Sequence, residues 1–234
     1  MNSNRRTAIL VGVLFLVSYL GVIAGSSLLE PALKGPDTLV DFQQRTQVMI
    51  GLLLELVNGI AVVAMAVILY PLLKYFNEGL ALGYVAMRIL ECAVQISMDL
   101  GPLTLLKLSQ GSVGAGASEV LPVQTTTALV LAERQSASLM LAIFFCAGAV
   151  LFYVLLYQSK LLPRFVSIWG LIAVALVFAT NIMDIGMPLG MIFALPIISN
   201  ELFVAIWLIV KGFNPSIIAP RTSIDSAATV SGSV

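Results

Sequence analysis

The chain has 234 residues, of which 59% are hydrophobic and only 10% are charged, and its mean hydropathy is +1.03. Because soluble domains carry about 25% charged residues, this composition excludes an ordinary soluble fold. Twelve basic and twelve acidic residues give zero net charge, which excludes the basic surface that nucleic-acid binding requires. With no His and only two Cys, we expect no metal site, no disulfide framework and no cofactor.

Six stretches of the chain satisfy the requirement of about 20 predominantly apolar residues for a membrane-spanning helix. The apolar core of the first exceeds the roughly 7 to 15 residues of a signal peptide, so we expect an uncleaved anchor. We predict an all-α integral membrane protein, a six-helix transmembrane bundle in a single domain over residues 1–213, followed by a disordered cytoplasmic tail over 214–234. The predicted spans are about 8–28, 48–73, 80–106, 136–157, 165–184 and 189–210.

The orientation follows from the basic residues, which favour short cytoplasmic loops. If the N-terminus is cytoplasmic, seven basic residues lie inside and four, among them Arg134, lie outside. Both termini are therefore predicted to be cytoplasmic, and the connections 29–47 and 107–135 face the exterior. Within the second connection, residues 119–134 either extend the fourth helix or lie on the outer surface.

Ionisable residues inside the spans are the main functional signal, because such groups are costly in a bilayer and commonly functional. On the third span Arg88, Glu91, Gln95 and Asp99 are three, four and four residues apart, so they lie on one helix face. The second and sixth spans add further polar groups at similar depth. The predicted intramembrane polar site comprises Glu55, Asn58, Arg88, Glu91, Gln95, Asn200 and Glu201, and its outer rim comprises Asp99, Asn181 and Asp184.

The deep charges of this predicted site do not balance. Glu55, Glu91 and Glu201 face a single guanidinium, that of Arg88, which leaves a formal charge of minus two. Burying unpaired charge is prohibitive, so either some carboxyl groups are protonated or a cation is bound. We therefore predict a carboxylate-rich site in the outer half of the membrane that binds, senses or moves a small cation, a proton or a cationic solute.

The alternative is a non-catalytic accessory or structural membrane protein whose intramembrane charges only pair helices. Six spans without an evident internal repeat is small for a secondary transporter, and the oligomeric state, including a homo-oligomer, stays open. Enzymatic activity is not expected, since no His, zincin helix or Gly-x-Ser-x-Gly elbow occurs. The predicted partners are the lipid bilayer and the cationic solute or proton.

Two segments at the cytoplasmic ends of the last two spans combine basic and aromatic residues. Arg164 with Trp169 and Trp207 with Lys211 are predicted to be interfacial anchors, in preference to a lipid-specific site. These segments also carry a family pattern, formed by Leu162, Pro163, Arg164, Ser167, Ile168, Trp169, Gly170, Pro196, Glu201, Trp207, Leu208, Ile209, Lys211, Gly212 and Phe213, with Arg88, Glu133 and Arg134 upstream.

This pattern resembles the bacterial membrane-protein family catalogued as domain of unknown function 4386. The likeness covers nearly the whole chain, from about Arg6 to Phe213. It implies a multi-pass protein of about this span number in a bacterial plasma membrane. It implies no substrate, cofactor or catalytic residue.

Overall fold

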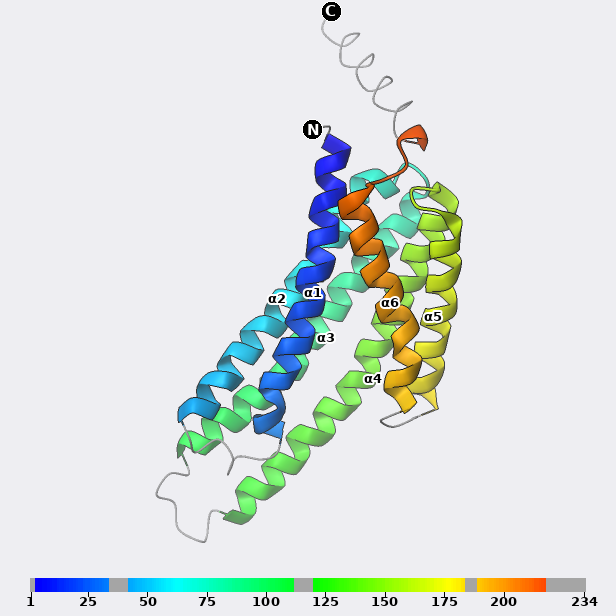
Figure 1. The fold of residues 1–234 in the computed structure, drawn as a ribbon. Helices are drawn as coiled ribbons and strands as arrows, with labels where there is room; N and C mark the ends of the chain where they lie inside the picture. Colours follow the sequence, from blue (N-terminus) through cyan, green and yellow to red (C-terminus); the bar gives the residue numbers. More distant parts are fainter. Residues whose placement is uncertain (1–2, 34–41, 112–119, 184–188, 218–234) are drawn as a thin grey trace, which may run out of the picture. The chain divides into compact units, whose positions relative to one another are not determined.

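A computed structural model describes residues 3–33, 42–111, 120–183 and 189–217, and in these ranges the chain is helical without strands. The elements are α1 (Ser3–Leu33), α2 (Phe42–Leu73), α3 (Glu78–Gly111), α4 (Val120–Ser159), α5 (Arg164–Ile182) and α6 (Leu189–Val210) (Figure 1). All six are long and apolar enough to cross a membrane. The predicted all-α, six-helix transmembrane fold class is confirmed.

The helices begin and end at residues whose chemistry accounts for the boundaries. Asn77 caps α3, because its side-chain oxygen accepts a hydrogen bond of 3.0 Å from the backbone N–H of Leu80. Pro163 immediately precedes α5, where its fixed φ suits the start of a helix. Lys160, the first residue after α4, and Gly212, the second residue after α6, have positive φ values of 55° and 78°, a conformation that stops a helix.

Several helices extend beyond the predicted apolar spans. The largest extension is in α4, which begins at Val120 rather than near residue 136, so the 119–134 stretch continues the fourth helix from residue 120. Of the predicted tail, residues 214–217 are described, and residues 218–234 lie outside the described residues. The parts of the two long connections at 34–41 and 112–119 lie outside them as well.

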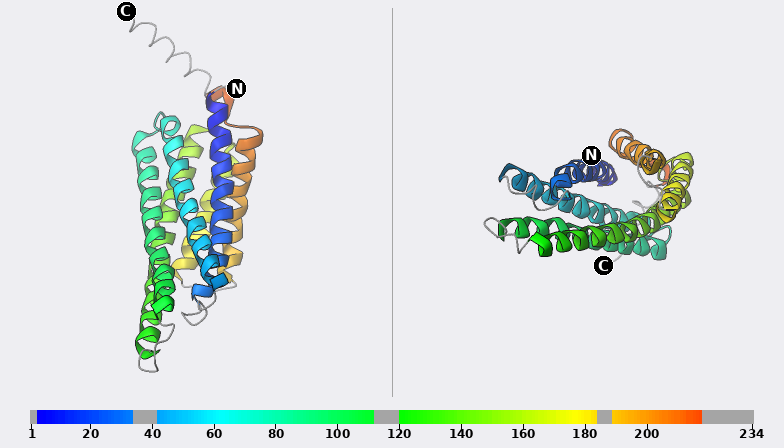
Figure 2. Two further views of the ribbon diagram at one scale, coloured as in Figure 1. Left: turned by 90° about the vertical axis from the view of Figure 1, so that its left-hand side faces the viewer. Right: turned by 90° about the horizontal axis from the view of Figure 1, so that it is seen from below.

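The described chain forms two compact units, and each of the helices α1 to α4, coloured from blue to green in Figure 2, contributes one part to each unit. Unit 1 comprises Met1–Phe15, Met65–Ala86 and Cys146–Val234, and therefore contains α5 and α6. Unit 2 comprises Leu16–Ala64 and Met87–Phe145. The predicted polar residues of the second and third spans belong to unit 2, whereas Asn181, Asn200 and Glu201 belong to unit 1.

Within unit 2, glycines allow α1 and α2 to approach closely. A Cβ added at Gly25 would lie 2.7 Å from Cγ of Glu55, and one added at Gly51 would lie 2.9 Å from the carbonyl oxygen of Gly25. Gly21 and Gly25 form the small-xxx-small spacing that supports tight helix pairs in membranes. This contact places the Glu55 side chain beside α1.

Within unit 1, aromatic side chains fill the space between helices. Tyr84 and Phe152 stack with ring centroids 5.3 Å apart, and both side chains are almost fully buried. The ring of Tyr153 occupies the space where a Cβ at Gly170 would be, so α5 packs closely on α4 at that glycine. The helices α5 and α6 lie side by side.

Candidate intramembrane polar site

The polar stripe predicted on α3 forms two local pairs. Arg88 donates a hydrogen bond from Nη1 to Oε2 of Glu91 at 2.7 Å, and its guanidinium lies 5.5 Å from the centroid of the Phe145 ring. One turn further, Nε2 of Gln95 donates to Oδ1 of Asp99 at 3.4 Å. Residues three and four apart on a helix are neighbours, so the spacing alone accounts for both pairs.

A three-helix cluster forms where Glu55 of α2 meets this stripe. Its carboxylate accepts a hydrogen bond from the side-chain amide of Gln95 on α3. Arg134 of α4 completes the cluster, with Nη2 at 3.9 Å from Oε2 of Glu55 and Nη1 at 3.7 Å from Oδ1 of Asp99. We call Glu55, Gln95, Asp99 and Arg134 the acidic cluster. All of them lie in unit 2.

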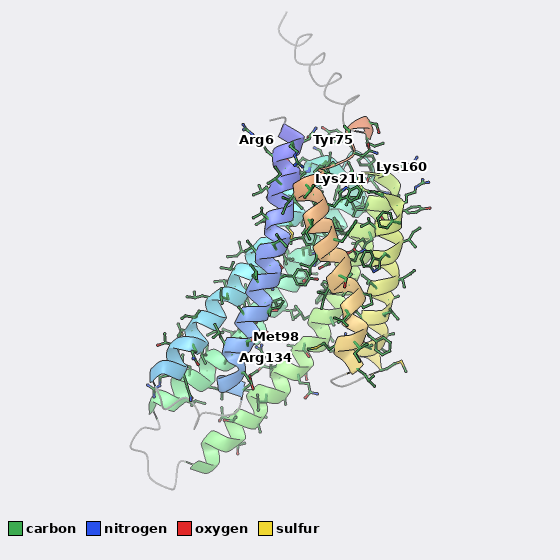
Figure 3. The ribbon with its side chains drawn as sticks, in the orientation of Figure 1. Arg6, Tyr75, Met98, Arg134, Lys160 and Lys211 are labelled. Carbon is green, nitrogen blue, oxygen red and sulfur yellow. The ribbon has the colours of Figure 1, made fainter. Side chains whose placement is uncertain are left out.

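Arg134 is also anchored to the backbone of α3. Its Nη1 donates a hydrogen bond of 2.8 Å to the carbonyl oxygen of Met98, and these two residues lie together in Figure 3. The side chain of Arg134 is only 15% exposed, and that of Glu55 only 3%. The guanidinium is therefore held between two carboxyl groups and a carbonyl, with little access to the protein surface.

Arg134 is the residue of the acidic cluster that the sequence analysis does not place in the polar site. The sequence predicts it among the exterior bases, whereas the structure places it within α4, inside an apolar stretch that runs from Thr125 to Ser159. The apolar run Ala128–Ala132, just before Glu133 and Arg134, could have indicated this position. It extends the hydrophobic part of the fourth helix to the N-terminal side of Arg134. Asp99, predicted at the outer rim, likewise belongs to the acidic cluster.

With Arg134 included, the charges of the α3 stripe and the acidic cluster nearly balance. Arg88 and Glu91 neutralise each other, and Arg134 offsets one of the two carboxylates of Glu55 and Asp99. With both carboxyl groups ionised, the acidic cluster has a formal charge of minus one. One proton or one monovalent cation would restore neutrality, so the arrangement is suited to a single positive charge.

Asn58, one turn after Glu55, contacts α1. Its Oδ1 accepts a hydrogen bond of 2.5 Å from Oγ of Ser18. The next glycine on α2, Gly59, allows close approach of α3, since an added Cβ would lie 2.9 Å from Sγ of Cys92. Asn58 therefore joins α1 to α2 one turn from Glu55.

The remaining predicted site residues belong to unit 1. Asn200 is fully buried. It accepts a hydrogen bond of 2.8 Å from the Tyr153 hydroxyl of α4 and donates one of 2.9 Å to the carbonyl oxygen of Val166 of α5. Glu201 is also buried, with 6% exposure. Asn200 thus joins α4, α5 and α6 through polar contacts.

Of the predicted rim, Asn181 is exposed and donates to the backbone carbonyl of Val177 in its own helix. Asp184 lies outside the described residues. The side chains of the predicted anchors are placed at helix ends in unit 1, where Arg164 lies 5.0 Å from the Tyr157 ring and Lys211 lies 4.2 Å from the Trp207 ring. Trp169 packs against Phe203, as does Trp207.

In the ranges that the structure covers, no three His, Cys, Asp or Glu residues are arranged so that they could hold a metal ion, so a cation bound at the acidic cluster would meet only its two carboxyl groups. The two carboxyl groups of the acidic cluster are each engaged by Gln95 and Arg134. The chemistry available is therefore proton exchange or ion pairing.

Six helices that are long and apolar enough to cross a membrane define a multi-pass, helical integral membrane protein. The chain matches the family described as domain of unknown function (DUF4386) over residues 10–212. It belongs to this family, as its sequence pattern suggested. No curated protein and no solved structure matches it significantly.

Proposed function

We propose that this protein binds one proton or one small monovalent cation, or the charged group of a cationic solute, at the carboxyl pair of Glu55 and Asp99. The observation that carries the proposal is the pairing of two carboxyl groups from different helices with one guanidinium, that of Arg134, in little-exposed surroundings. Such a site lacks one positive charge. Burial makes that deficit costly, so a proton or cation is favoured there.

The competing function is that of an accessory or structural protein in which these groups only pair helices. The hydrogen bond from Arg134 to the Met98 carbonyl favours it, because that contact joins α3 and α4 whether or not a cation is present. Intramembrane hydrogen bonds contribute about 0.6 kcal/mol each on average. Helix pairing would therefore gain little from a cluster with an unbalanced charge.

The cellular setting is part of the proposal. We propose a bacterial plasma membrane, with both termini cytoplasmic and no catalytic step. Arg6, Lys160 and Lys211 lie at the same end of unit 1 (Figure 3), as expected for a cytoplasmic face. Removing Arg134 from the exterior count strengthens the asymmetry of basic residues. Reporter fusions at the two termini test this orientation.

The binding test uses the purified full-length protein in a neutral detergent. Thermal unfolding is recorded with sodium, potassium or tetramethylammonium chloride, against N-methyl-D-glucamine chloride at the same ionic strength. A cation at 100 times its Kd adds about 2.7 kcal/mol to the stability of the folded state. A proton neutralises the same charge, so the cation-dependent shift should decrease as the pH is lowered.

Glu55→Gln and Asp99→Asn should each abolish the cation-dependent shift, because each removes the unbalanced negative charge. The matched control is Glu133→Gln, next to Arg134 in the chain but exposed, and it should keep the shift. If the wild type shows neither a specific cation effect nor a pH effect, or if both cluster variants keep them, helix pairing is the better account.

A further inference from the structure

A basic groove at one end of unit 1 is a candidate site separate from the acidic cluster. It has a volume of about 550 Å³ and is lined by residues of the α4–α5 connection and of the chain following α6. Asn214 joins the two segments, donating from its backbone N–H to the Leu161 carbonyl at 3.0 Å and from Nδ2 to the Lys160 carbonyl at 3.5 Å. Segments about 50 residues apart in the sequence thus form one concave surface.

Three cations line this groove, namely Lys160 after α4, Arg164 at the start of α5 and Lys211 after α6. None of the described lining residues is acidic. Among the residues that the structure describes, Lys160, Arg164 and Lys211 take part in none of the ion pairs with carboxylates. The groove therefore carries a formal charge of plus three without a counter-ion from the described residues.

The start of α5 adds backbone donors to the same place. Pro163, the residue before the helix, makes no side-chain capping hydrogen bond, although its backbone carbonyl accepts a hydrogen bond of 3.0 Å from the N–H of Val166. Uncapped N–H groups at a helix N-terminus carry partial positive charge and favour anions such as phosphate. Pro163 and Arg164 both line the groove.

By contrast, the end of α6 already has its partner. Arg5 donates hydrogen bonds to the carbonyl oxygens of Leu208, Ile209 and Val210 at 3.1, 2.6 and 3.1 Å. These bonds satisfy the carbonyl groups that a helix C-terminus leaves without partners. Arg5 thereby neutralises the negative end of the α6 dipole, so Lys160, Arg164 and Lys211 are not needed for that purpose.

Apolar side chains next to the groove are exposed on the protein surface, among them Tyr157 at 40%, Phe165 at 53% and Val210 at 66%. Trp207 and Phe213 line the groove itself. A lipid presents an anionic headgroup with apolar chains attached to it, and this surface offers cations and N–H groups beside apolar contacts. A soluble anion would contact the cations and N–H groups but would have no use for the apolar side chains.

We propose that this groove binds the phosphate-bearing headgroup of an anionic phospholipid, with Lys160, Arg164 and Lys211 contacting the headgroup. Basic pockets at the ends of membrane helices are suited to such headgroups. The structure thereby unites the two segments that the sequence analysis treated as separate interfacial anchors. The site is independent of the acidic cluster and of the function proposed for it.

The test titrates the delipidated full-length protein in a neutral detergent with dioleoyl-phosphatidylglycerol, dioleoyl-phosphatidylcholine or inorganic phosphate at constant ionic strength. The chain has two Trp residues. Trp169→Phe therefore leaves Trp207 as the fluorescent reporter inside the groove. We expect saturable binding of phosphatidylglycerol and at least tenfold weaker binding of phosphatidylcholine and of free phosphate.

Each groove charge should contribute about fivefold to the affinity, so Arg164→Gln with Lys211→Gln should weaken phosphatidylglycerol binding about 25-fold. The charge-matched control is Arg6→Gln with Lys74→Gln, two exposed basic residues of unit 1 outside the groove lining. It should retain the wild-type affinity. Thermal unfolding in lipid-free detergent checks that each variant is folded.

Equal binding of the two lipids by the wild type, a result that needs no variant, overturns the proposal. So does an equal loss of affinity in the control pair, which would mean that only the general charge of this end attracts the lipid. Free phosphate binding as tightly as phosphatidylglycerol would assign the groove to a soluble anion and refute the lipid assignment.

Discussion

Replacing Arg134 by Gln tests whether the acidic cluster stabilises the fold through charge. The guanidinium approaches two carboxylates at 3.9 and 3.7 Å, and at an effective dielectric constant of about 20 each such approach corresponds to about 4 kcal/mol of gross attraction. Desolvation offsets much of this attraction, and removing one partner of a buried pair costs about 3 to 5 kcal/mol. Because the carboxyl groups can take up a proton in response, we expect a loss near the lower limit, about 3 kcal/mol.

The formal charge of the acidic cluster also predicts how a double variant should behave. Arg134→Gln changes the formal charge of the acidic cluster from minus one to minus two, and adding Glu55→Gln returns it to minus one. The double variant should therefore be more stable than Arg134→Gln alone, by about 1 to 2 kcal/mol. The coupling between the two sites should be of similar size, within the usual range for residues in direct contact.

The assay is equilibrium unfolding of the four proteins of this cycle by SDS titration in mixed micelles, followed by circular dichroism. Glu133→Gln provides the control, because an exposed substitution usually changes stability by no more than about 0.5 kcal/mol. Additive effects of Arg134→Gln and Glu55→Gln would refute the ionic coupling. Arg134 would then act through its hydrogen bond to the Met98 carbonyl.

Two further predictions concern helix packing, one in each unit. Gly25→Leu should destabilise the protein by about 2 to 4 kcal/mol, since overpacking is costly and even a Cβ would lie 2.7 Å from Cγ of Glu55. The control is Gly79→Ala, because a Cβ there would meet only Asn77 Oδ1, at 3.6 Å. Equal unfolding midpoints for the two variants would contradict the close approach of α1 and α2 at Gly25. Asn200→Leu should cost about 2 to 3 kcal/mol, because it removes the acceptor of the hydrogen bond that the buried Tyr153 hydroxyl donates. Adding Tyr153→Phe should recover part of that loss, and no recovery would show that this hydrogen bond is not the main contribution of Asn200.

The sequence was most informative where the consequence of a residue is local. The pairs Arg88–Glu91 and Gln95–Asp99 follow from helical spacing alone, and the structure contains both. The sequence places Glu55 in one polar site with Gln95, but it does not predict the pairing of Glu55 with Arg134, which lies on α4. A residue's neighbours on other helices depend on which helices pack together and at what rotation, and helical periodicity carries no information on either.

Composition and hydropathy by themselves determined that this chain is a six-helix membrane protein, because a bilayer leaves helices with internally satisfied backbones as the solution for long apolar segments. They also located the ionisable residues that required an explanation. Only the tertiary structure decided how those charges balance, by bringing Arg134 between Glu55 and Asp99 and by joining the segments around Arg164 and Lys211 into one groove. The physical reason is that electrostatic energy depends on the distances between charges on different helices. Close contacts between helices, such as that of Gly25 on α1 with Gly51 on α2, determine these distances.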